Sequence, residues 1–162
     1  CTRAYSDHIG MPKLLLFGYG NPGRGDDSLG PLLVESINQL NCPHIVKLMD
    51  MQLLIEHATD LLGFDQILFV DADVSCRAPF EFTAIAAEKD SSYTSHTLTP
   101  AALLFIYEHI YRCSAPPSCL LRIRGYQFEL GNGLSKQAHE NLCAAIHYVH
   151  TVYLTPHHLL SK

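Results

Sequence analysis

Short, continuously apolar segments alternate along this chain with longer segments whose apolar residues recur every three or four positions. Residues 13–18 and 66–71 are of the first kind, and each run is stopped by a residue that is not apolar. Such runs are typical of strands that are covered on both faces of a parallel sheet. We expect further strands over residues 44–48, 80–86 and 119–123.

Helices are predicted between these strands. Residues 31–40 carry apolar side chains at helical spacing, and Pro31 fits the first turn of a helix. The other expected helices cover residues 52–62, 100–111 and 135–150. The alternation predicts an α/β fold, a three-layer sandwich in which a mainly parallel, twisted sheet has helices on both faces. In such a fold, binding groups lie beyond the carboxyl ends of the strands.

The length of the chain favours one domain. Its 162 residues, 48% of them hydrophobic, can bury one core and are too few for two ordinary domains. We place this domain at residues 11–155. Residues 1–10 and 156–162 are expected to be terminal tails, the first because it lacks the apolar core and cleavage site of a signal peptide.

The charge and the apolar content argue against several partners. With a formal net charge of −5 and no dense cluster of Lys and Arg, the chain is not expected to bind nucleic acid. No apolar run approaches the roughly 20 residues that cross a bilayer, so no membrane partner is expected. Six scattered cysteines without a CxxC pair indicate reduced thiols, and we expect a cytoplasmic protein.

A glycine-rich turn follows the first predicted strand. Its pattern, Gly18-x-Gly20-x-x-Gly23, is that of a dinucleotide-binding turn. Pro22 removes one backbone donor, however, and a phosphate at this turn would face the carboxylates of Asp26 and Asp27. A P-loop is excluded because no GK[ST] ends the turn. A nucleotide-binding module that uses residues 18–23 remains the alternative function.

Asp27 and Asp71 are candidate ligands for a cation. Asp71 ends an apolar strand, and in a parallel sheet it therefore emerges at the same edge as Asp27. His96, in a polar loop before a predicted helix, supplies a possible third ligand. Taken singly, the two acids fit helix caps or turn residues, and a loop histidine fits a solvated surface. Together they form an O/O/N set that nickel or zinc accepts.

At this point the sequence resembles a known family. The order Gly18-x-Gly20-Asn21 after the first strand, then Asp26-Asp27-x-x-Gly30, is similar to the signature of the nickel-iron hydrogenase maturation endopeptidases. The form of residues 22–27 is most similar to those that serve bidirectional or NAD-coupled hydrogenases. Asp71 matches the second acid of the family and His96 its histidine. The similarity covers roughly residues 13–150.

The resemblance implies an endopeptidase that removes the C-terminal extension of a hydrogenase large-subunit precursor once nickel has been inserted. It also implies that nickel held by the substrate is recognised by Asp27, Asp71 and His96, while Asp26 supports them together with Gly18, Gly20 and Asn21. The nickel would arrive with the precursor and would not belong to the resting enzyme. A relative that binds metal or precursor without cutting it is a further alternative.

Two other sets of side chains compete with this interpretation. Cys76 follows the strand that ends at Asp71, but a nucleophilic thiol needs an imidazole within reach and a lowered pKa. His139, Cys143 and His147 share one stripe of the last predicted helix, a spacing that could bind zinc. Because the apolar stripe of that helix lies beside them, we interpret them as the polar flank of a packed helix.

Overall fold

The computed structural model describes residues 12–39, 42–89 and 98–154, and the predicted tails 1–10 and 156–162 lie outside these ranges. The described elements follow in chain order: β1 (Leu14–Tyr19), η1 (Gly25–Ser28), α1 (Leu29–Ser36), β2 (Ile45–Asp50), η2 (Ile55–Leu61), β3 (Gln66–Asp73), β4 (Phe80–Ile85), α2 (Pro100–Tyr111), β5 (Ser118–Arg124), α3 (Lys136–Tyr148) and η3 (Val149–Tyr153).

The sheet has five strands in the order β2-β1-β3-β5-β4, and it is parallel except for β4, which runs antiparallel to β5. In this register Tyr19 lies opposite Asp50, and Asp71 lies opposite Arg122. The carboxyl ends of β2, β1, β3 and β5 therefore meet at one edge of the sheet, called here the carboxyl edge. The predicted mainly parallel sheet is confirmed.

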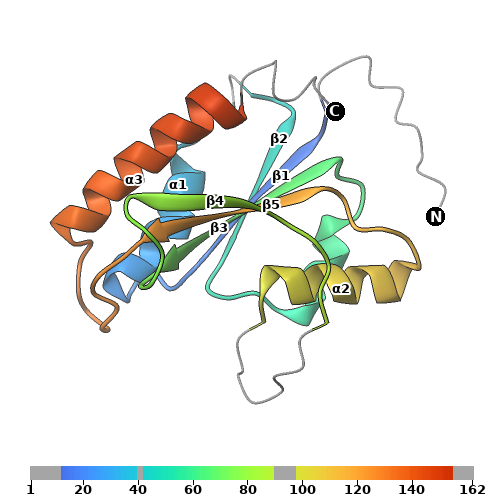
Figure 1. Ribbon diagram of the computed structural model, residues 1–162, viewed down its shortest axis with the longest axis horizontal. Helices are drawn as coiled ribbons and strands as arrows, with labels where there is room; N and C mark the ends of the chain where they lie inside the picture. The colour runs from blue at the N-terminus through green and yellow to red at the C-terminus, as the bar shows by residue number, and fades with distance from the viewer. Residues whose placement is uncertain (1–11, 40–41, 90–97, 155–162) are drawn as a thin grey trace.

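Helical elements cover both faces of the sheet (Figure 1). On one face, Leu33 of α1 and Leu142 of α3 pack against Leu16 and Leu68 of the central strands. On the other face, side chains of η2 and α2 pack against Phe17 and Phe69. The predicted three-layer α/β sandwich is thereby confirmed. No helix among the described residues is long and apolar enough to cross a membrane.

The second predicted helix, residues 52–62, is wrong in type and in extent. Leu54 is extended, with φ −123° and ψ 156°, and the helical turns begin only at Ile55, as the 3₁₀ element η2. The His57 imidazole accepts a hydrogen bond from Leu54 N at 2.8 Å, and His57 N donates to Leu54 O. Because these bonds fix the start of η2 and Gly63 follows with φ +90°, an α-helix of the predicted length does not form.

The boundaries of two other helices also differ from the prediction. α1 begins at Leu29, directly after η1, and ends at Ser36, because Ile37 is extended and its N–H bonds to Val34 O at 3.2 Å. The last helix passes from α3 into the π-helical turn η3 at Val149. The predicted strands agree with the structure to within a few residues.

Candidate functional site

The glycine turn brings the end of β1 against η1. Gly20 has φ +150°, and a Cβ on it would collide with the backbone oxygen of Asp27. A Cβ on Gly18 would collide with the backbone of Gly30 in α1. The two glycines therefore permit a close approach between parts of this chain, and the backbone of η1 fills the space beside Gly20.

Asp27 is held by the turn that precedes it. Its Oδ2 accepts a hydrogen bond from Asn21 N at 2.8 Å, while Asn21 Oδ1 accepts one from Gly23 N at 2.8 Å. The side chain is half-buried, at the carboxyl edge beyond β1. Asn21 and the glycine turn thus fix the orientation of one carboxylate oxygen.

Asp26 has a structural role. It is fully buried, and its carboxylate accepts hydrogen bonds from Tyr126 N, Gln127 N, Ser135 N and Ser135 Oγ, at 2.7 to 3.0 Å. Burial alone raises the pKa of Asp26, but the hydrogen bonds from Ser135, Tyr126 and Gln127 outweigh it and hold the pKa below its usual value. Asp26 joins η1 to the loop between β5 and α3.

Asp71 lies at the carboxyl edge of β3, next to Tyr19 and Asp27. Its pKa is raised to about 7, mainly by burial and also by the nearby charge of Asp27, although hydrogen bonds from Ala72 N and the Tyr19 hydroxyl act to lower it. Burial also raises the pKa of Tyr19, so this phenol keeps its proton and donates a hydrogen bond to the carboxylate of Asp71. The structure therefore brings the two predicted acids into one site.

Tyr19 and His57 are residues that sequence reasoning missed. Tyr19 is only 8% exposed and reads as the last residue of an apolar strand, yet its hydroxyl reaches the site. His57 Nε2 lies 3.0 Å from Asp50 Oδ2, and its Nδ1 accepts the Leu54 N–H. The ring is therefore neutral and donates from Nε2. Strand register was the signal available for Tyr19, because it places the position after Gly18 beside Asp71.

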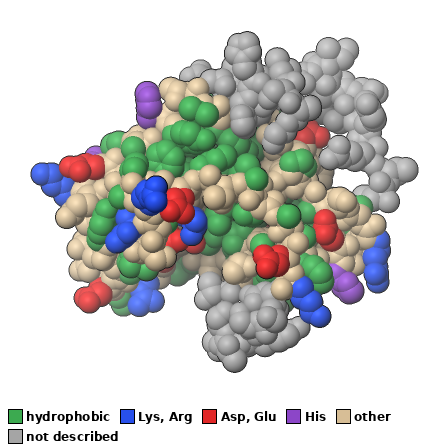
Figure 2. Space-filling model, in the orientation of Figure 1, with side chains coloured by type: hydrophobic (Ala, Val, Ile, Leu, Met, Phe, Trp, Pro, Cys, Tyr) green, Lys and Arg blue, Asp and Glu red, His purple; other side chains and the backbone are tan. Residues whose placement is uncertain are grey.

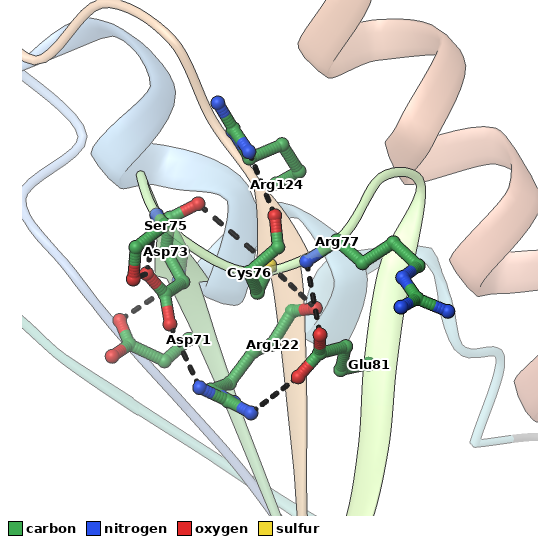
Figure 3. Close-up of polar contacts among 9 residues, drawn as sticks. Asp71, Asp73, Ser75, Cys76, Arg77, Glu81, Arg122 and Arg124 are labelled. Atoms are coloured by element: carbon green, nitrogen blue, oxygen red, sulfur yellow. Dashed lines mark hydrogen bonds and ion pairs between the residues drawn. The ribbon is translucent and has the colours of Figure 1, made fainter.

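The far side of Asp71 is a network of paired charges. Arg122 lies between two carboxylates, with Nη1 3.1 Å from Asp73 Oδ2 and Nη2 2.5 Å from Glu81 Oε2 (Figure 3). Arg77 N donates to Glu81 Oε1 at 3.0 Å. On the face of the molecule that Figure 2 shows, some basic and acidic side chains lie next to one another.

Cys76 does not have the surroundings of a nucleophile. Its sulfur contacts the backbone oxygens of Asp73 and Arg122, at 3.8 and 3.6 Å. Burial raises the pKa of this thiol, so the reactive thiolate is disfavoured at neutral pH. The Cys–His alternative has no support in these contacts.

The predicted third ligand, His96, lies outside the described residues. Within the part of the chain that the structure describes, no group of three His, Cys, Asp or Glu side chains is arranged to hold a metal ion. In the stripe on α3, Cys143 Sγ contacts His139 Nε2 at 3.7 Å, and this stripe does not form such a group. Metal binding by Asp27, Asp71 and His96 therefore stays a prediction.

Known structures share this fold. The [NiFe] hydrogenase maturation protease HycI from Thermococcus kodakarensis KOD1 superposes with a TM-score of 0.64 at 18% identity, over 87% of this chain and 92% of that one. The hydrogenase maturating endopeptidase HybD from E. coli superposes with a TM-score of 0.65 at 19% identity, over 85% of this chain and 89% of that one. A hydrogenase 2 maturation peptidase from Thaumarchaeota archaeon SCGC_AB-539-E09 superposes with a TM-score of 0.61 at 19% identity, over 88% of this chain and 99% of that one.

Comparisons of sequence add no relative to these. No protein-family model matches the chain, and no curated protein is significantly similar to it. At the identities above, the structural likeness establishes the fold, which is the fold that the sequence resemblance implies.

Proposed function

We propose that this protein is an endopeptidase that removes the C-terminal extension of a nickel-iron hydrogenase large-subunit precursor after nickel insertion. The observation that carries the proposal is the meeting of Asp27 and Asp71 at the carboxyl edge of a sheet with the fold of maturation proteases. The known activity of these proteases and the glycine-aspartate motif support the same proposal.

The two acids suit a cation that is delivered by the substrate. Carboxylate oxygens and an imidazole nitrogen are accepted by nickel, and His96 would complete the set. With a pKa of about 7, Asp71 holds a proton on a large fraction of molecules at neutral pH. An arriving divalent ion displaces that proton, because it stabilises the ionised carboxylate that burial disfavours.

Dependence on the metal would make cleavage conditional on correct loading. A divalent ion polarises a nearby carbonyl or lowers the pKa of a bound water, which is the chemistry that peptide hydrolysis needs. The residues of the chain itself orient this centre: Asn21 N fixes Asp27, while Ala72 N and Tyr19 fix Asp71. A precursor without nickel would leave the acids without a cation to bind, and it would not be cut.

Three substitutions test the proposal on nickel-loaded precursor. Asp27→Asn, Asp71→Asn and His96→Ala should each lower the cleavage rate at least about a hundredfold, because each removes a charge or a ligand at the reacting centre. Asp65→Asn, near the start of β3 and the opposite edge of the sheet, should cleave like the wild type. Full cleavage by the Asp27 and Asp71 variants would refute the assigned site, and precursor binding without cleavage by the wild type would indicate a non-catalytic relative.

The alternative of a nucleotide-binding module finds no support in the glycine turn, because η1 occupies the space beside Gly20. Direct titration with NAD(H) checks this point. Binding that survives Asp27→Asn would revive the alternative.

A further inference from the structure

The two flanks of the acidic site differ in character. On the side of β5 and β4, Arg122 is paired with both Asp73 and Glu81 (Figure 3). On the side of β2, the chain leaves the sheet at Asp50 and turns into η2. Asp50 lies opposite Tyr19, which itself contacts Asp71, so this second flank is continuous with the site.

Three large apolar side chains are exposed on the second flank. Met51 is 57% exposed, Leu54 38% and Ile55 61%, and all lie within five consecutive residues. We call Met51, Leu54 and Ile55 the β2–η2 surface. Leu53 between them is buried and anchors the segment to the core. Exposed apolar side chains that gather next to a site, instead of being scattered, are typical of a protein interface.

The β2–η2 surface is held in a fixed shape. Asp50 Oδ1 accepts a hydrogen bond from Met51 N at 2.7 Å, and Asp50 Oδ2 contacts His57 Nε2 at 3.0 Å. His57 Nδ1 in turn accepts a hydrogen bond from Leu54 N at 2.8 Å. The His57 ring also packs edge-on against Phe17 in the core, at 4.9 Å between ring centroids. A surface fixed in this way loses little conformational entropy when it binds a partner.

The charges around the β2–η2 surface define the chemistry of its partner. Residues 48–63 contain Asp50, Glu56 and Asp60 but no Lys or Arg, and Glu56 and Asp60 are exposed. An apolar area with an acidic border is complementary to an apolar area that Lys or Arg side chains border.

We propose that the β2–η2 surface docks the folded part of the precursor, through an apolar area bordered by basic residues. This inference rests on the proposed function, since a folded substrate whose C-terminal segment reaches Asp27 and Asp71 must lie over one flank of the site. The flank of β2 combines exposed apolar side chains with an acidic border, whereas on the flank of β5 and β4 the exposed Val74 adjoins Asp73, which is paired with Arg122. Docking at this surface would set the affinity for the precursor and leave the chemical step unchanged.

The test compares two isoleucines with similar exposure. Ile55→Asp should raise KM for nickel-loaded precursor at least about tenfold, with kcat within about twofold, because a charge at the centre of an interface removes a large share of its binding energy. Ile110→Asp, which changes a 50% exposed isoleucine in the last turn of α2, should leave KM unchanged. Met51→Asp provides a second variant if Ile55→Asp folds poorly, and thermal unfolding checks both.

Charge reversal at the border should act in the same direction. Glu56→Lys is expected to raise KM several-fold at low salt, and the difference should shrink at high salt as the charges are screened. An unchanged KM in Ile55→Asp and Met51→Asp would overturn the docking proposal while wild-type cleavage still supports the proposed function. A homodimer that Ile55→Asp dissolves without a change in KM would also overturn it and assign the surface to a second copy. Absence of wild-type cleavage would overturn both.

Discussion

At the scale of single residues, the site pairs a carboxyl group that the fold destabilises in its ionised form with the groups that orient it. The pKa of Asp71 is raised from 3.8 to about 7, so an ionised Asp71 costs roughly 4 kcal/mol of folding free energy. Since the folded state binds the proton more tightly, this cost is absent below pH 4, grows between pH 4 and 7, and is complete above pH 7. A loss of folding stability of this kind is expected where a residue is retained for function.

Asp71→Asn therefore should be more stable than the wild type at pH 8, by up to about 4 kcal/mol, and the difference should disappear toward pH 4. The asparagine cannot ionise, so it avoids the cost that the buried carboxylate carries. Urea unfolding at pH 4, 6 and 8 measures the difference. A difference that does not grow with pH, or a wild type that is the more stable protein at pH 8, would contradict the assigned environment of Asp71.

Tyr19→Phe tests the residue that orients Asp71. Without the phenol, the carboxylate loses a donor that lowers its pKa, so we expect a cleavage rate about tenfold lower and an acid limb of the pH–rate profile shifted to higher pH. Tyr107→Phe removes a hydroxyl from a buried tyrosine of the same apolar cluster and is the matched control. Equal pH profiles for wild type and Tyr19→Phe would remove Tyr19 from the site.

At the scale of elements, one buried carboxylate connects segments that lie far apart in the sequence. Asp26 accepts four hydrogen bonds from residues 126–135, and Ser135 in turn caps α3 by accepting Ala138 N at 3.2 Å. The position of η1, and with it that of Asp27, therefore depends on the loop that leads into α3.

Asp26→Ala should lower the free energy of unfolding by about 3 kcal/mol or more, because it leaves several buried donors without an acceptor. Asp65→Ala removes one exposed hydrogen bond that Lys13 N donates, and it should lower the free energy of unfolding by less than about 1 kcal/mol. Chemical denaturation of both variants compares them. Equal losses would show that Asp26 does not hold η1 in place.

The sequence predicted the strands and helices better than it predicted the hydrogen bonds that connect them. The apolar runs located the strands because burial on both faces needs such runs. The helical pattern of residues 52–62 misled because the spacing of apolar residues does not reveal the side-chain hydrogen bonds of His57 to Leu54 N and Asp50, which fix the start of η2. The partners of Asp26 could not be predicted, because they follow it by 100 to 109 residues.

At the scale of the whole molecule, the register of the parallel sheet is what assembles the site. The predicted three-layer α/β fold placed Asp27 and Asp71 at one edge, and in the structure the two carboxyl groups are near enough there for the charge of Asp27 to raise the pKa of Asp71. Sequence reasoning did not include Tyr19, because an aromatic residue at the end of an apolar strand is usually part of the core. The β2–η2 surface was also not foreseen, since exposure is set by tertiary packing.

The measurement that tests the central claim most directly is the intact mass of a hydrogenase large-subunit precursor after incubation with this protein, with and without inserted nickel. We predict that the nickel-loaded precursor loses its C-terminal extension and that the nickel-free precursor keeps its full mass. Equal cleavage of both forms, or of neither, would contradict the account of Asp27 and Asp71 as acids that recognise a metal carried by the substrate.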